Sequence, residues 1–314
     1  MIRYILGRVG QALAVLVVTF TAAFVLLQAL PGDAIMIKFM SPEMGLSAEQ
    51  VAEIRASYGA DLPIWEQYLK TVGNFLSGNF GYSIQAGVPV RHQLAVNLPP
   101  TLQLAGLAFL AAVLLTVVLA AMSNMVGMGR LRGALQSLPS LFISIPVFWL
   151  GIMLIQIFSF QLGLVSVISP GPVEKLVLPV ATLAIPISAP LAQVLMRNID
   201  EVLAQPFVAV ARAKGASRSW VLWRHVARNA VLPTLTIAGI LFGELLAGAV
   251  VTEAVFGLSG LGGLTYQAVN NHDTAVLQAI VVISAFAFVT INLVVDLLYP
   301  VVDPRLGHRV ATTT

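Results

Sequence analysis

Few side chains in this sequence could do chemistry, and three carboxylates stand out because they fall within or at the edges of strongly apolar stretches. Glu244 lies in the middle of such a stretch, whereas Glu253 and Asp296 lie near the ends of theirs. A charge at the bilayer centre costs about 2.5–3.5 kcal/mol on insertion scales. We therefore expect Glu244 to face protein or water, either as a pathway residue or as a protonated or paired structural acid. Glu253 and Asp296 are pathway candidates as well, or acids that simply reach the membrane interface.

Catalytic and metal-binding patterns are absent from the sequence. The chain has no cysteine, its four histidines are far apart, and it contains neither G-x-x-x-x-G-K-[ST] nor G-x-S-x-G. The glycine-rich run Gly257–Gly263 lacks the phosphate-binding lysine and is expected to be an external turn. We therefore predict a non-enzyme with no catalytic residue, no metal site and no cofactor of its own.

The longest basic stretch, residues 197–233, separates two apolar stretches. Pro206 is placed to begin a short helix at about Phe207–Lys214, and Gly215 should interrupt it. A second helix is expected to begin after Ser217 or Ser219. The bend between these helices predicts a compact knob that presents small side chains.

The second helix of this stretch is expected to run to about Ala230 and to be amphipathic. Trp220 and Trp223 recur at helical spacing with two alanines, while arginines occupy another stripe. Such a helix is suited to lying at the membrane surface, and its basic side could simply meet anionic lipid. Lipid binding does not explain the short helix that precedes it.

The composition predicts a polytopic membrane protein, because 58% of the residues are hydrophobic and 10% are charged, against about 25% charged in soluble domains. A membrane-spanning helix needs roughly 20 apolar residues. The first apolar stretch is too long for the core of a cleaved signal peptide and is expected to be retained. The six predicted spans are about Val9–Leu30, Leu98–Asn124, Leu135–Phe160, Leu176–Met196, Asn229–Val251 and Ala275–Tyr299.

Basic residues are divided unevenly among the connecting segments. One alternating set of segments carries 12 of the 17 Lys and Arg residues. By the positive-inside rule, both termini and the two basic loops are expected in the cytoplasm. The prediction is an all-α protein with a first helix in 1–31, an external helical subdomain in 32–96, a five-helix core in 97–300 and a cytoplasmic tail in 301–314.

The external segment is expected to fold. Ser47 and Gln50 form a capping-box pattern for a helix to about Ser57. Pro63 precedes a second helix with apolar side chains at helical spacing, and residues 78–87 are glycine-rich and turn-like. Two interpretations of this segment remain: it is a small cap packed over the external mouth, or it is a loop that only connects the spans.

Prolines cluster in two of the predicted spans. Each proline removes a helical hydrogen bond and kinks its helix. Two explanations would account for this clustering: the helices bend around a pathway, or they are packed irregularly without such a role. The prolines concerned are Pro139, Pro146, Pro179, Pro186 and Pro190.

Motifs along nearly the whole chain resemble one family. The Ala211…Gly215 pattern with a following Leu232-Pro233 looks like the EAA loop of ABC importer permeases. The longer run ARAKGASRSWVLWRHVARNAVLPTL is similar to the dipeptide and oligopeptide permease branch. The other motifs similar to that branch are LPGDA, GNFGYS, PVRHQL, SIPVFWLG, LLAGAVVTEAVFGLSGLG and NLVVDLLYPVVDPR.

The resemblance implies a type I ABC importer permease fold with six transmembrane helices, in the inner membrane of a prokaryote, for uptake of di- or oligopeptides. The implied partners are a second homologous permease that completes a heterodimer, two ATP-binding subunits, an extracytoplasmic substrate-binding protein and membrane lipid, with no nucleic acid. The ATPases, and not this chain, would bind ATP and Mg. The coupling-loop residues implied to dock on them are Phe207, Ala209, Ala211, Arg212, Lys214, Gly215 and Ala216.

The sequence departs from the family pattern at two places. Ala209 replaces the EAA glutamate, with Val210 at its first alanine, so the salt bridge of that glutamate is not expected here. Glu244 stands where a small or uncharged residue is expected.

Within the ABC importer interpretation, nickel chelates, haem and oligosaccharides are alternative cargoes. An ion-gradient transporter would need an inverted repeat, and a membrane enzyme would need a catalytic constellation; the sequence has neither.

Overall fold

In the computed structural model of this chain, the regular elements of the described residues are helices and one short two-stranded hairpin. The predicted cytoplasmic tail falls outside the described residues from residue 303 onward. The described residues are 2–29, 38–39, 47–58, 61–125 and 129–302.

The chain divides into two compact units, which are described separately below. Unit 1 is built from residues 1–10, 102–256 and 290–314. Unit 2 is built from residues 11–101 and 257–289.

Five of the helices described are long and apolar enough to cross a membrane, and each contains most of a stretch predicted from the sequence. Two pairs of bent helices bring the number of candidate spans to as many as seven. The five long helices are α1 (Ile2–Gln28), α5 (Val90–Met125), α8 (Glu174–Leu203), α11 (Ala227–Phe256) and α13 (Thr274–Val302).

The third predicted span, Leu135–Phe160, is broken at Pro146, one of the two prolines expected to kink it. It consists of α6 (Gly129–Ser144) and of α7 (Val147–Leu154), which continues as the π-helix η1 (Ile155–Gln161). The two parts are bent by 102°. Pro146 lies at the break in an extended conformation, with φ −60° and ψ 133°, and it has no N–H with which to continue α6.

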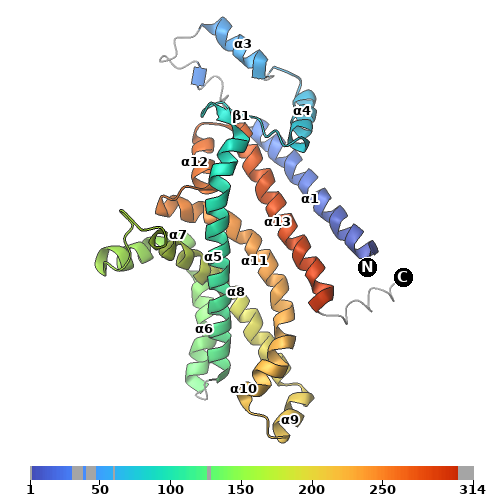
Figure 1. The fold of residues 1–314 in the computed structure, drawn as a ribbon, viewed down its shortest axis with the longest axis vertical. Coiled ribbons are helices and arrows are strands. Elements are labelled where there is room, and N and C mark those ends of the chain that lie inside the picture. Colours follow the sequence, from blue (N-terminus) through green and yellow to red (C-terminus); the bar gives the residue numbers. More distant parts are fainter. Residues whose placement is uncertain (1, 30–37, 40–46, 59–60, 126–128, 303–314) are drawn as a thin grey trace. The chain divides into compact units, whose positions relative to one another are not determined.

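Helix α8 is the central element of unit 1, where it packs against α6, α7 and α11 (Figure 1). Its packed face combines leucine with small residues such as Ala189 and Ala192. Three prolines lie inside α8, and the helix continues through them. A side-chain hydrogen bond from Thr116 of α5 to the Ser188 carbonyl, at 3.2 Å, supports the proline-rich part. Membrane helices tolerate proline where such neighbours supply hydrogen bonds.

Unit 2 contains the two helices predicted for the external segment, α3 (Ala48–Tyr58) and α4 (Ile64–Leu76). The capping box is confirmed: the Gln50 N–H donates to Ser47 Oγ at 3.3 Å, and the Ser47 N–H donates to Gln50 Oε1 at 2.8 Å. Helix α4 follows Pro63, as expected.

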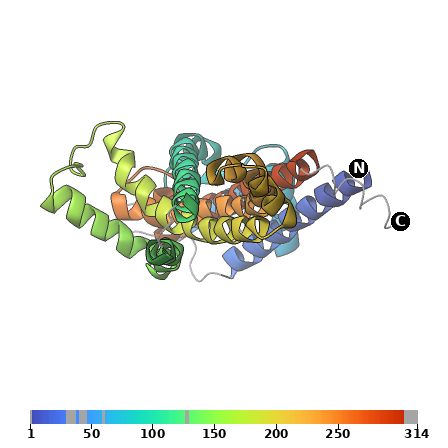
Figure 2. The ribbon, with the colours of Figure 1, turned by 90° about the horizontal axis from the view of Figure 1, so that it is seen from below.

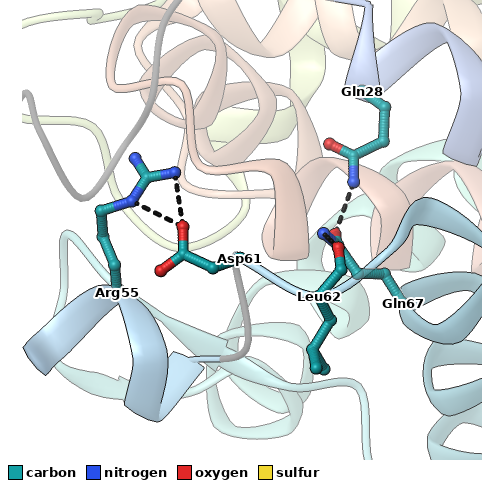
Figure 3. Close-up of polar contacts among 5 residues, drawn as sticks. All are labelled: Gln28, Arg55, Asp61, Leu62 and Gln67. Carbon is teal, nitrogen blue, oxygen red and sulfur yellow. Dashed lines mark hydrogen bonds and ion pairs between the residues drawn. The ribbon is translucent and has the colours of Figure 1, made fainter. Parts of the chain in front are cut away.

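Polar and aromatic contacts hold α4 against α1 within unit 2. Gln28 donates to Gln67 at 2.6 Å, and Gln67 in turn donates to the Leu62 carbonyl at 2.8 Å (Figure 3). In the same view, Arg55 of α3 pairs with Asp61 at 3.1 Å. The aromatic rings of α1 and α4 pack edge to face. These residues form a packed structure, although their predicted position over an external mouth stays a prediction.

The glycine-rich residues 78–87 of unit 2 are turn-like, as predicted, with positive φ at Gly78, Gly81 and Gly87. This part of the chain forms an antiparallel hairpin of β1 (Tyr82–Ser83) and β2 (Val88–Pro89). Helix α5 begins directly after it, so the last part of the predicted external segment is helical. The predicted turn Gly257–Gly263 is a turn only at its start, because α12 (Leu261–Asn270) begins inside it.

Candidate functional site

The basic stretch folds into the predicted knob, formed by α9 (Pro206–Ala213), a turn at Gly215 and α10 (Arg218–Val221). Pro206 is the first residue of α9, where its missing N–H costs nothing. Gly215 has a φ of +88°, a left-handed conformation that glycine adopts without steric cost. Ser217 caps α10 by accepting a hydrogen bond from the Trp220 N–H at 3.2 Å. Both predicted helix starts and the glycine break are therefore confirmed.

The inner side of the knob is fixed to a hydrophobic cluster of unit 1. Val208 is 1% exposed, and it packs with residues of α8 and of the chain after α10, including Ile199 and Val226. Ala211 and Ala216 are half-buried against the same cluster. Of the seven residues assigned to coupling, these two alanines therefore help to anchor the knob.

The outer side of the knob is exposed, and it carries the other five predicted coupling residues: Phe207, Ala209, Arg212, Lys214 and Gly215. In Figure 1, α9 and α10 lie at the lower end of unit 1, and Figure 2, seen from below, shows them nearest to the viewer. The sequence-based assignment omitted Val210, which is 55% exposed on this side.

An open groove runs between α9 and α10. The ring of His225 packs edge-on against Trp220, with centroids 4.9 Å apart, and against Phe207, with centroids 6.2 Å apart. The coupling assignment did not include Trp220 and His225, because both follow the Ala211…Gly215 motif in sequence. They line the groove only because the chain turns at Gly215. The groove is lined by Phe207, Val210, Ala211, Lys214, Gly215, Ala216, Ser217, Trp220 and His225.

The second helix of the basic stretch is not a separate surface helix that ends near Ala230. From α10 the chain continues without a break through the π-helix η2 (Leu222–Val226) into α11. The wider π-turn shifts the faces, so Val221, Leu222 and Val226 are buried. Trp220 and Trp223 are 51% and 56% exposed, and they remain free to meet a membrane surface or a partner.

The three acidic pathway candidates have different surroundings. Asp296 of α13 forms an ion pair with Arg8 of α1 at 3.3 Å, and both side chains belong to unit 1. Glu253 is 1% exposed, so its side chain is enclosed by the protein. Glu244 is exposed, and within the described part of the chain it makes no hydrogen bond or ion pair.

Polar contacts that the sequence analysis did not predict join α6 and α8 in unit 1. Gln193 of α8 donates to Ser140 of α6 at 3.3 Å, and both residues are exposed. Further along the same pair of helices, Asp200 accepts from Arg132 at 2.6 Å and from Gln136 at 3.3 Å. The only sequence signal was an isolated polar residue inside an apolar stretch. No group of three or more His, Asp or Glu side chains in the described ranges could hold a metal ion.

Two family profiles together match nearly the whole chain. The profile of "binding-protein-dependent transport system inner membrane component" matches residues 112–308, and the corresponding N-terminal profile matches residues 1–105. The chain is 33% identical to a probable peptide ABC transporter permease protein, y4tP, of Sinorhizobium fredii, covering 97% of this chain and 99% of the relative. It is 32% identical to the glutathione transport system permease protein GsiC of Escherichia coli, covering 98% and 100%.

Solved structures share the fold. A chain of the inward-facing MetNI methionine ABC transporter superposes with a TM-score of 0.58 at 17% identity, covering 67% of this chain and 96% of that chain. A chain from the crystal structure of an amino acid ABC transporter with histidines superposes with a TM-score of 0.52 at 21% identity, covering 65% and 91%.

Proposed function

Because this chain belongs to the family of binding-protein-dependent transport system inner membrane components, we propose that its cargo is di- or oligopeptides. The chain is the non-catalytic permease subunit of an ATP-driven importer in a bacterial inner membrane, and it works with ATPase subunits and a binding protein. Two relatives support the cargo: one is named a probable peptide permease, and another is named for glutathione, which is itself a tripeptide.

In the proposed assembly, a second homologous permease completes a heterodimer around the pathway. Two ATP-binding subunits hold ATP and Mg, and an extracytoplasmic binding protein delivers the peptide. Both termini and the knob lie in the cytoplasm, since the knob and the residues after it expose the basic side chains Arg212, Lys214, Arg218 and Arg224.

The knob is the proposed docking surface for an ATPase subunit. One observation carries this assignment: Val208 is buried in the hydrophobic cluster, while Phe207 and Val210 beside it are 42% and 55% exposed. An exposed apolar surface of this kind, with a lysine at its edge, is typical of a protein contact. The missing EAA glutamate leaves shape and apolar contact to hold the partner.

The buried anchor explains how docking is coupled to the spans. Val208 packs in one cluster with residues of α8, including Leu195 and Ile199, and with Ala230 of α11. When ATP binding closes the ATPases and displaces the knob, close packing passes the movement to both helices. The spans then open outward to receive the peptide, and hydrolysis resets the inward-open state.

The function is tested with the purified importer in proteoliposomes. Uptake of radiolabelled trialanine should require internal ATP and the binding protein, and unlabelled di- and tripeptides should compete with it. Nickel chelates, haem and oligosaccharides are the matched competitors. Uptake driven by a proton or sodium gradient without ATP would contradict the ABC mechanism, and competition by a non-peptide alone would reassign the cargo.

A further inference from the structure

Glu244 is an exposed carboxylate in the middle of a membrane-spanning helix. It shares one face of α11 with Ile240 and Val251, which are 49% and 46% exposed. The opposite face packs inside unit 1 through Gly239, Leu246 and Ala249. The carboxylate therefore points away from its own unit, and because a charge facing lipid is strongly disfavoured, this face of α11 borders water or protein.

Two contacts between α8 and α11 give the depth of Glu244. Asn198 donates to the Ala230 carbonyl at 3.2 Å, and a Cβ at Gly248 would lie 3.4 Å from Leu183. Because the two helices are antiparallel, Glu244 lies about level with Pro186. The basic residues of α8, Lys175 and Arg197, are each 11 residues from Pro186, or about 16 Å along the helix axis.

A second hydrogen-bond acceptor lies at this depth. Pro190 has no N–H, so it cannot donate to the Pro186 carbonyl in the helical pattern. Pro186 and Pro190 are both partly exposed. The level of Glu244 along the helices therefore offers its carboxylate and the Pro186 carbonyl as acceptors, and it is distant from the cations of α8. This composition suits a ligand with several N–H donors and a positive charge.

We propose that Glu244 binds the protonated amino terminus of the peptide during its passage through the membrane. This inference rests on the proposed peptide cargo. An ammonium group carries three donors and one positive charge, and it forms charge-assisted hydrogen bonds with a carboxylate. Glu244 thus selects for a free amino end within the pathway, in addition to any selection by the binding protein.

The test compares trialanine with N-acetyl-trialanine as substrates of the complete reconstituted importer. The ratio of their kcat/KM values is measured for the wild type and for Glu244→Gln. Because the binding protein is the same in both, its own preference cancels. The ratio should fall by on the order of 10- to 100-fold in Glu244→Gln. It should be unchanged in Ile240→Gln, which places the same amide one turn away, and largely kept in Glu244→Asp.

The outcomes separate this inference from the cargo assignment. An unchanged ratio in Glu244→Gln, or failure of that variant to assemble with the second permease, would overturn the role of Glu244. Absence of trialanine uptake by the wild type would instead remove the proposed cargo.

If the acetylated peptide is not transported at all, disulfide cross-linking decides the question. The chain has no cysteine of its own, so Ile240→Cys introduces a single thiol in this chain, one turn from the retained Glu244 carboxylate. The tripeptide Cys-Ala-Ala should cross-link to position 240 during turnover faster than Ala-Ala-Cys, and this preference should be lost when Glu244→Gln is added. Equal rates, the reverse order or no cross-link would overturn the proposal.

Discussion

Substitution of Gly215 separates backbone strain from bulk on the proposed docking surface. Its φ is +88°, and an L side chain in the left-handed region costs roughly 1–2 kcal/mol. Within the described chain, a Cβ at Gly215 would meet no atom within 4 Å. Gly215→Ala therefore adds strain alone, whereas Gly215→Trp adds the same strain together with a large side chain that projects from the knob.

The two variants should differ strongly in transport. A strain of 1–2 kcal/mol reduces the population of the native turn by about 5- to 30-fold at most, and the buried Val208 opposes that loss. We expect Gly215→Ala to retain measurable uptake and Gly215→Trp to abolish it. Both variants should insert normally, because the turn lies outside the spans. The assays are ATP-dependent peptide uptake and co-purification of the ATPase subunit.

Wild-type uptake by Gly215→Trp would refute the assignment of the knob as a docking surface. Equal loss in the alanine and tryptophan variants would assign the effect to backbone strain and not to contact. Gly133→Ala is the matched control, since a Cβ at Gly133 also meets nothing but this glycine has a helical φ in α6. It should leave uptake unchanged.

Three further substitutions test contacts within each unit. Val208→Ala should cost about 2 kcal/mol through a cavity under the knob, lowering Tm together with ATP-coupled uptake. Asp296→Asn should destabilise by less than about 1 kcal/mol, because the ion pair with Arg8 is partly exposed; the exchange of both charges should restore Tm, and failure to do so would make the pair incidental. Ser83→Ala should cost about 1–3 kcal/mol, because the buried Asp273 carboxylate loses the hydrogen bond from the Ser83 hydroxyl. The hairpin should then be digested faster by protease. An unchanged rate of proteolysis would contradict a stabilising role for this hydrogen bond.

The knob was predicted well. Its signals are local: Pro206 has a fixed φ, Gly215 has a positive φ, and Ser217 caps a helix. Each of them acts within one turn of the backbone. The capping box of Ser47 and Gln50 is of the same kind. Such features depend on residues adjacent in sequence, so their positions agree with the structure to within a residue or two.

Predictions about where a helix ends or continues were less successful. Periodicity predicted a separate amphipathic helix that ends near Ala230, but α10 continues through the π-turn of η2 into α11, with Val221 and Val226 buried. A kink at Pro146 was predicted from the proline itself, but hydropathy gave no sign of its size, because both arms of the broken span are apolar. An apolar stretch has the same composition whether its helix is straight or bent.

By itself, the sequence determined the membrane class, the order of the spans, the position of the knob and the family, since all of these depend on composition, local turn chemistry and motifs. The three acids show what only the tertiary structure decided. Asp296 is paired with an arginine of the first helix, Glu253 is buried, and Glu244 alone of the three is exposed without a partner in the described chain. Pairing and burial depend on residues far apart in sequence, so they follow only when the helices pack.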